Sequence, residues 1–238
     1  HNALSPMMIK ELSESFDELK EDPNTKVLII SAKGKSFCAG GDLDWMKEQI
    51  FSDRKTRIEE ARKLADLLYK MYQFPKPLIA KVEGNAFGGG IGIISVCDVA
   101  ISIENIKLAL TEAKLGLIPA TISPYVISKV GSSNGIDLFT SARTFYPPEA
   151  KNIGLIKSFC NQERIDNIIN EEADSILING PSAVKASKNL VRNLSSKIDE
   201  NTIKFTVEAL ADVWENPESI EGINAFFEKR KTKLDNGE

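Results

Sequence analysis

Residues 75–101 read PKPLIAKVEGNAFGGGIGIISVCDVAI, and this stretch sets the architecture of the chain. The apolar run 78–82 predicts a buried strand, because it is short and is bounded by proline and glycine. A glycine-rich turn at 84–90 follows, and it opens into a second apolar run at 91–96. Glycine lets a backbone approach a ligand closely, so this turn is the first candidate for a binding loop.

The segments on either side alternate between helical and extended patterns. Apolar residues recur at helical spacing over 9–19, after the N-cap candidate Ser5 and Pro6, and again over 58–71. Short apolar runs predict further strands, at 27–30, 99–103 and 107–110. From about Ile122 onward the pattern is mainly helical. This order predicts an α/β core with a helical C-terminal region.

Charge and composition remove several classes of function. The 238-residue chain has a formal net charge of −4, which argues against nucleic-acid binding by bulk electrostatics. Its single histidine is residue 1, so serine–histidine and cysteine–histidine relays and histidine-based zinc sites lack their main ingredient. Three cysteines give no disulfide framework, and we expect a reducing compartment. Acid–base chemistry must therefore use carboxylate, lysine, tyrosine, cysteine or backbone groups.

Two glycine-containing turns are the candidates for chemistry. The first is FCAGGDL at 37–43 and the second is GNAFGGG at 84–90. A helix N-terminus presents free N–H groups and a partial positive charge, so two such turns side by side can aim two N–H groups at one oxygen. That arrangement is an oxyanion hole. Each turn alone is better explained as a tight loop, and only the pair indicates chemistry.

The pair of turns resembles the enoyl-CoA hydratase/isomerase (crotonase) family. The segment at 37–43 resembles its first oxyanion loop, and residues 75–101 resemble its second. Three further segments agree in order, namely TEAKLGLIP at 111–119, residues 148–156, and residues 221–231. The resemblance covers essentially the whole chain, and it is specific because five separate motifs recur in sequence.

The resemblance implies a crotonase-like spiral of ββα units over residues 1–180 and a helical trimerisation region over residues 181–238. Assembly as a homotrimer or a dimer of trimers is expected. Residues 1–4 resemble the loop after the family's first strand, so we expect an N-terminal segment to be missing. The shared substrate would be a coenzyme A thioester. We expect no cofactor beyond the coenzyme A carried by the substrate, and no metal.

The resemblance also assigns roles to individual residues. The backbone N–H groups of Gly41 and Gly89 would hold the thioester oxygen, where negative charge grows as an enolate forms. Glu112 matches the family's second catalytic glutamate. The position of the first is Gly92, so this chain keeps one of the two acids. An apolar environment around Glu112 would raise its pKa towards working pH, which suits a group that acts as both base and acid.

Six further residues are predicted to contact the substrate. Ala39 and Gly88 lie in the two loops, and Trp45 follows the first of them. Asp42 is expected to fix the first loop through local hydrogen bonds. Tyr125, in the segment SPYV that replaces the family's commoner glycine-rich one, is expected to shape the acyl pocket. Lys231, in a basic C-terminal cluster, is expected to reach a phosphate of coenzyme A.

Three functions remain open at this point. Hydration of a 2-enoyl-CoA is favoured, because FGGGIG and LGLIPATISPYV look like hydratases of the methylglutaconyl-CoA and isohexenylglutaconyl-CoA type, which act on branched, carboxylated acyl groups. Single-glutamate members of the family include Δ3,Δ2-enoyl-CoA isomerases, which need no water. A catalytically inactive acyl-CoA-binding protein is the third reading, suggested by Gly92. No nucleic-acid or membrane partner is expected, and the predicted location is cytoplasmic, or the mitochondrial matrix in a eukaryote.

Overall fold

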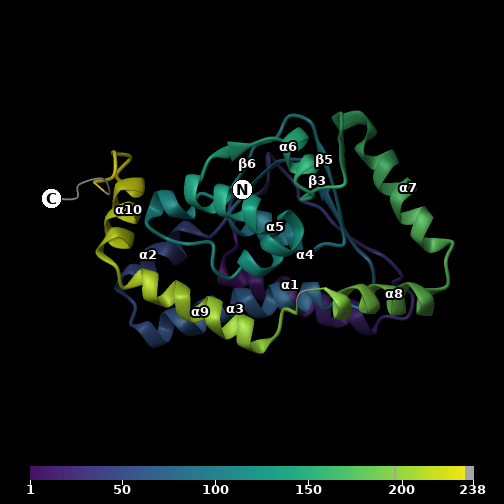
Figure 1. Ribbon diagram of the computed structural model, residues 1–238, viewed down its shortest axis with the longest axis horizontal. Coiled ribbons are helices and arrows are strands. Elements are labelled where there is room, and N and C mark those ends of the chain that lie inside the picture. The colour runs from purple at the N-terminus through teal and green to yellow at the C-terminus, as the bar shows by residue number, and fades with distance from the viewer. Residues whose placement is uncertain (196, 234–238) are drawn as a thin grey trace.

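The computed structural model describes residues 1–195 and 197–233, and it confirms the predicted α/β class. The strands form two sheets of four strands each, and helices surround them (Figure 1). In the described part of the chain no helix is both long enough and apolar enough to cross a membrane.

The first sheet has the order β1-β3-β5-β8, and all of its neighbouring strands are parallel. Its strands are β1 (Leu28–Ile30), β3 (Leu78–Val82), β5 (Val99–Ile103) and β8 (Ser158–Cys160). Strands β3 and β5 are central, and Leu78, Ile79 and Ile101 are completely buried. Burial on both faces explains why these strands appear in the sequence as continuous apolar runs.

The second sheet has the order β2-β4-β6-β7. Its strands are β2 (Ser36–Cys38), β4 (Asn85–Phe87), β6 (Leu108–Ala109) and β7 (Thr144–Phe145). The first three run parallel, and β7 is antiparallel to β6. These strands are only two or three residues long, so their backbone pairing rather than an apolar pattern identifies them.

Consecutive strands alternate between the two sheets, as β1 and β2, β3 and β4, then β5 and β6. Helices α2 (Leu43–Phe51) and α3 (Arg54–Tyr72) connect β2 to β3, and α4 (Gly89–Val96) connects β4 to β5. Each turn of the chain therefore adds one strand to each sheet. This is the predicted spiral of ββα units.

Helix α1 (Pro6–Glu21) begins where the sequence predicts. The Ser5 hydroxyl accepts a hydrogen bond from the Met8 N–H at 3.2 Å, and Pro6 occupies the first helical position. Phe16 then packs edge-on against Phe74, with 5.1 Å between the ring centroids, and this contact anchors the helix to the core.

The C-terminal half is mainly helical, as predicted. Its helices are η1 (Glu112–Leu115), α5 (Ser123–Ser141), α6 (Pro147–Asn152), η2 (Gln162–Arg164), α7 (Ile165–Leu177), α8 (Pro181–Leu194), α9 (Glu200–Trp214) and α10 (Pro217–Phe227). In Figure 1, α7 lies at the right, α8 and α9 run along the lower edge, and α10 stands at the left. Helix α9 packs along α3, and α10 contacts η1 and α2. Helix α8, by contrast, has no fully buried residue.

Three segments differ from the sequence-based expectation. Strand β2 overlaps the start of the turn predicted at 37–43, and β8 lies in the region expected to be mainly helical. Both are formed by parallel pairing with a distant strand, β2 with β4 and β8 with β5. Helix α10 ends at Phe227, within the motif at 221–231, and Lys229 beyond it has a left-handed backbone (φ 52°). The predicted boundary at residue 180 stays a prediction.

Candidate active site

Three neighbouring parallel strands end at the same edge of the second sheet. The first glycine loop follows β2, the second follows β4, and Thr111-Glu112 follow β6. Because the carboxyl ends of parallel strands meet, segments 70 residues apart in sequence come together here. The Gly88 N–H donates to the carbonyl of Ala109 at 3.0 Å, which ties the second loop to the end of β6.

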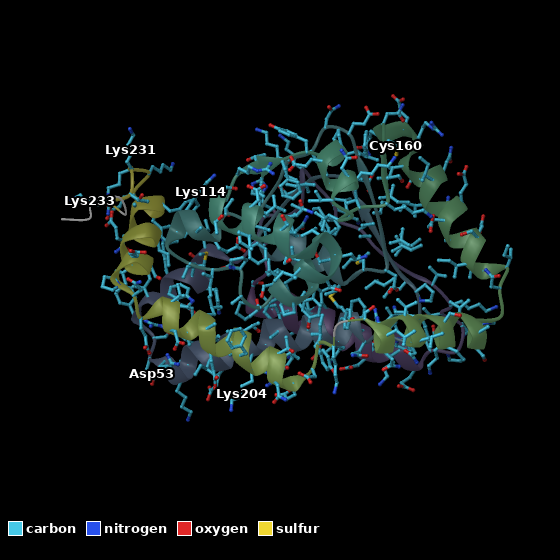
Figure 2. The ribbon with its side chains drawn as sticks, viewed as in Figure 1. Asp53, Lys114, Cys160, Lys204, Lys231 and Lys233 are labelled. Atoms are coloured by element: carbon cyan, nitrogen blue, oxygen red, sulfur yellow. The ribbon has the colours of Figure 1, made fainter. Side chains whose placement is uncertain are left out.

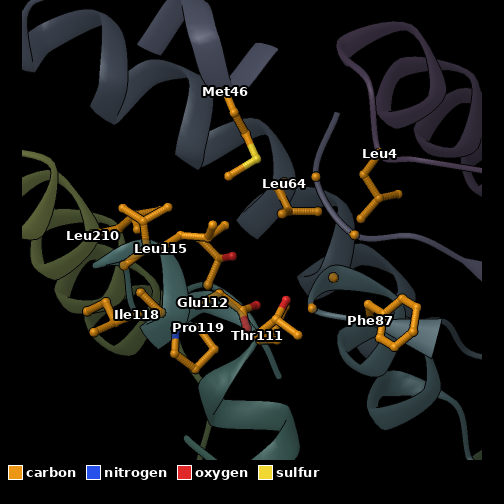
Figure 3. A pocket seen from close by; sticks show the side chains of 18 of the residues that line it. Leu4, Met46, Leu64, Phe87, Thr111, Glu112, Leu115, Ile118, Pro119 and Leu210 are labelled. Atoms are coloured by element: carbon orange, nitrogen blue, oxygen red, sulfur yellow. The ribbon is translucent and has the colours of Figure 1, made fainter. Parts of the chain in front are cut away.

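These strand ends border a cavity of about 410 Å³. Figure 3 shows Glu112 in its centre, among the apolar side chains of Leu115, Met46 and Leu64. Of the described residues that line the cavity, Glu112 and Lys114 alone carry a charge. The cavity therefore suits an apolar group held beside one carboxylate.

Glu112 is the first residue of η1, directly after the loop from β6. Burial raises the pKa of its carboxyl from 4.5 to about 7. Its Oε2 atom is buried and has no hydrogen-bond partner among the described residues. A carboxylate with a free oxygen and a pKa near neutrality can both accept and return a proton at physiological pH.

Gly41 and Gly89, one from each glycine loop, both line this cavity. Leu4 pairs with the first loop, donating its N–H to the Gly40 carbonyl at 2.8 Å and accepting from the Asp42 N–H at 3.4 Å. The N–H group of Gly41, which lies between these two residues, takes no part in the pairing with Leu4. Gly89 is the first residue of α4, where an N–H has no acceptor within its own helix, and no side chain caps this helix.

Gly88 requires glycine for two reasons. Its backbone is left-handed (φ 48°, ψ −115°), a conformation that side-chain-bearing residues rarely adopt. A Cβ atom built on Gly88 would also lie 2.9 Å from Oε1 of Glu112. The absent side chain therefore lets the carboxylate lie directly against the loop that supplies the Gly89 N–H.

The position of the missing second acid is physically closed. A Cβ atom built on Gly92 would lie 2.3 Å from Cγ2 of Ile122, a residue that is itself 2% exposed. Ile122 precedes α5 and also lines the cavity. Helix α4 thus packs closely on Ile122 at this point, and the site is built around a single carboxylate.

Six of the nine predicted site residues line this cavity, namely Ala39, Gly41, Trp45, Gly88, Gly89 and Glu112. Asp42 instead caps α2, because its carboxylate accepts from the N–H groups of Asp44 and Trp45, each at 3.1 Å. This geometry matches the local role expected for it.

The other two predicted residues lie elsewhere. Tyr125 is 1% exposed and packs on Tyr72, with 5.4 Å between the ring centroids. It borders a different cavity, so its position does not fit the predicted contact with an acyl group. Lys231 lies beyond the end of α10 and is exposed, towards the same side of the view as Lys114 (Figure 2).

Several cavity residues carried no signal in the sequence. Leu4 enters from the N-terminus, and Leu210, Trp214 and Phe226 enter from α9 and α10. As apolar residues at helical spacing, the last three are indistinguishable from ordinary core positions. Lys114 could have been noticed, since it lies two residues after Glu112 in the same motif.

Comparisons with known proteins identify the family of this chain. The enoyl-CoA hydratase/isomerase family profile matches residues 1–237. Short-chain-enoyl-CoA hydratase from Clostridium acetobutylicum is 32% identical over 237 residues, covering 97% of this chain and 88% of that protein. Mitochondrial methylglutaconyl-CoA hydratase from Mus musculus is 31% identical over 236 residues, covering 96% of this chain and 74% of that protein.

The fold is also similar to that of solved structures. The crystal structure of an enoyl-CoA hydratase from Shewanella pealeana superposes with a TM-score of 0.80 at 37% identity, covering 98% of this chain and 88% of that one. The resemblance seen in the motifs is therefore confirmed over the whole chain. This protein belongs to the enoyl-CoA hydratase/isomerase family.

Proposed function

We propose that this protein is an enoyl-CoA hydratase, which adds water across the double bond of a 2-enoyl-CoA. The observation that carries the proposal is the position of Glu112, whose carboxylate lies against Gly88 in a cavity that Gly41 and Gly89 of the two glycine loops also line. The names of the family relatives support the same activity.

In the proposed reaction Glu112 moves the proton that hydration requires. Ionised Glu112 accepts a proton from water while the water oxygen bonds to C3 of the acyl group. The electron pair of the double bond shifts to the thioester, whose oxygen becomes an enolate oxygen bound by the N–H groups of Gly41 and Gly89. Glu112 then returns the proton to C2, which re-forms the carbonyl and leaves the carboxylate ionised.

The single carboxylate favours one alternative, a Δ3,Δ2-enoyl-CoA isomerase. Ile122 occupies the space beside Gly92, so Glu112 is the one carboxylate among the described residues that line the cavity. An isomerase needs only one group that removes a proton from one carbon and returns it to another. The apolar walls would exclude water from such a reaction.

For the substrate we propose a short, branched acyl group, including a carboxylated one of the methylglutaconyl type. The apolar cavity of about 410 Å³ suits a compact hydrocarbon chain. Lys114 is the cation that lines it, and it can pair with a terminal carboxylate or with a phosphate of coenzyme A. Lys231 is proposed as a second phosphate contact. Cofactors and metals other than the substrate's coenzyme A are not required by this scheme.

We also propose a homotrimer or a dimer of trimers. Helix α8 has no fully buried residue, and Leu190, Val191 and Leu194 are 61%, 63% and 80% exposed. Phe205 on α9 is 70% exposed. An apolar surface of this kind is typical of a subunit interface.

Turnover in water enriched in oxygen-18 distinguishes the three readings. 3-Methylglutaconyl-CoA, crotonyl-CoA and a 3-enoyl-CoA would be supplied in turn, with product mass as the readout and Glu112→Gln as the control. Label that enters the product with wild type, and is lost with Glu112→Gln, supports hydration. A mass-neutral shift of the double bond identifies an isomerase. Acyl-CoA that binds without turnover would refute both reactions.

A further inference from the structure

A second cavity, of about 480 Å³, shares no lining residue with the first. It lies where α8 meets α5 and the end of α4, and Tyr72, Asp98 and Tyr125 are part of its wall. Three cations also line it, namely Lys129 from α5 and Lys188 and Arg192 from α8. The mechanism proposed above uses none of these groups.

Two of the three cations pair with a single acid. The carboxylate of Asp98 accepts from Arg192 Nη2 at 3.1 Å, from Lys188, and from the backbone N–H of Leu78 at 2.8 Å. Lys129 reaches only the backbone carbonyl of Asp98, at 3.2 Å. Asp98 is the one carboxylate among the described residues that line the cavity, so three positive charges face one negative charge.

These charges are also largely removed from water. The side chains of Lys188 and Arg192 are 8% and 12% exposed. Burial lowers the pKa of Lys188 to about 8, and it also lowers the pKa of Lys129 and of Arg192. For each of the three groups this effect exceeds the opposite effect of the nearby Asp98 carboxylate, which raises the pKa. One carboxylate therefore does not compensate for the desolvation of three cations.

Two polar atoms at this cavity have no hydrogen-bond partner within the described part of the chain. Nη1 of Arg192 and the hydroxyl of Tyr125 are buried, and neither makes a hydrogen bond among the described residues. The Arg192 guanidinium stacks on the Tyr72 ring, 4.3 Å from its centroid, which fixes the direction of its free donor. A buried guanidinium donor without an acceptor is costly, so an acceptor from outside the chain would complete the arrangement.

We propose that this cavity is a binding site for a small oxyanion carrying about two negative charges, such as inorganic phosphate or the phosphate group of a small metabolite. Two negative charges balance the excess left by Lys129, Lys188, Arg192 and Asp98. Oxyanions provide several acceptors for guanidinium and ammonium donors. The bound anion would join α8, which has no fully buried residue, to α5 and the first sheet.

Sulfate is the probe for the test, because its charge does not change near neutral pH. Calorimetric titration of the intact protein, with chloride replacing sulfate at constant ionic strength, is expected to show saturable binding at one site per chain. Arg192→Gln and Lys129→Gln should each weaken that binding about tenfold or more, the effect of losing one charge-assisted contact. Lys114→Gln, which removes the cation at the other cavity, should leave it unchanged.

Arg192→Lys provides a check if Arg192→Gln fails to fold, since it keeps the charge and removes the second arm of the guanidinium; weaker sulfate binding is expected there as well. A glycerol phosphate titration shows whether the site also takes a phosphate monoester. No saturable binding beyond that of chloride would overturn the proposal. Sulfate binding that is lost in Lys114→Gln but kept in Lys129→Gln would place the anion at the proposed coenzyme A site and overturn the proposal. Sulfate binding that is seen only after the subunits dissociate would also overturn it, because the cations would then be paired with an acid of a partner subunit in the assembly.

Discussion

Glu112 combines burial, an unpartnered oxygen and contact with a glycine backbone, and these features have one physical origin. The residue begins a short 3-10 helix at the end of a strand, so its side chain is directed into the cavity rather than along a surface. Desolvation then raises its pKa to about 7. The proton affinity needed for the proposed chemistry thus follows from placement alone.

Removal of the ionisable oxygen should abolish most of the activity. For Glu112→Gln we expect kcat to fall by roughly 10²- to 10⁴-fold, the usual contribution of a positioned general acid–base group. Because the wild-type base must be ionised, its kcat/KM should rise with pH through about 7. The pH profile of the wild type and the residual rate of the variant can be measured in the same assay. A flat wild-type profile between pH 6 and 8 would argue against Glu112 as the base.

The same residue should influence stability. The folded-state pKa lies above the unfolded value, so native Glu112 holds its proton more tightly, and this stabilisation is complete below pH 4.5 and is lost as pH rises through about 7. A shift from 4.5 to about 7 corresponds to a loss of about 3 kcal/mol by pH 8. Urea unfolding at pH 5 and pH 8 should therefore show that the free energy of unfolding of Glu112→Gln, relative to that of wild type, is higher at pH 8 than at pH 5. An equal difference at both values would contradict the buried environment.

At the scale of elements, the contact between α4 and the start of α5 decides how many acids the site can hold. Gly92 and Ile122 occupy the place where a second carboxylate would be attached. Gly92→Ala should lower the free energy of unfolding by about 1–3 kcal/mol, as overpacking of a dense core does. In an Ile122→Gly background the same substitution should cost less, because the contacting side chain is gone. If the losses in free energy of unfolding simply add in the double variant, the side chains at the two positions are not in contact.

The cap of α2 positions the first glycine loop. Asp42 accepts two backbone N–H groups there, and Gly41 immediately precedes it. Asp42→Ala should cost about 1 kcal/mol of stability and should lower kcat/KM by loosening the loop. Asp42→Asn keeps an acceptor oxygen and serves as the matched control, with smaller losses expected in both quantities. Equal losses in the two variants would mean that the charge, rather than the cap, is what matters.

Elements with strong local patterns were predictable, and those formed by distant pairing were not. Strand β3 and helix α3 follow from apolar runs and helical spacing, and the glycine loops follow from composition. Strand β2 exists because Ser36 pairs with Asn85, a contact that no local pattern records. Likewise, Tyr125 was assigned to the acyl pocket from its neighbourhood in sequence, yet α5 turns its ring towards Tyr72.

At the scale of the whole molecule, α8 carries three strongly exposed apolar side chains, those of Leu190, Val191 and Leu194. Charges introduced by Leu190→Glu and Leu194→Glu together should convert the proposed trimer to monomers, measured by light scattering. Met7 is a matched control, since it is 70% exposed on α1 among the charged residues Lys10, Glu11 and Glu14. Met7→Glu should leave the mass unchanged. A wild-type protein that is already monomeric would refute the proposed assembly.

The alternation of strands between two sheets also fixes when the site can appear during synthesis of the chain. The two glycine loops can meet once β4 has paired with β2, but Glu112 arrives only with β6. Leu210 and Phe226 close the cavity only after α9 and α10 have left the ribosome. The complete cavity therefore forms only late in synthesis. A chain that stops before α9 would have its carboxylate in place within an open, wetter groove, and the proton affinity of Glu112 would fall towards that of an ordinary glutamate.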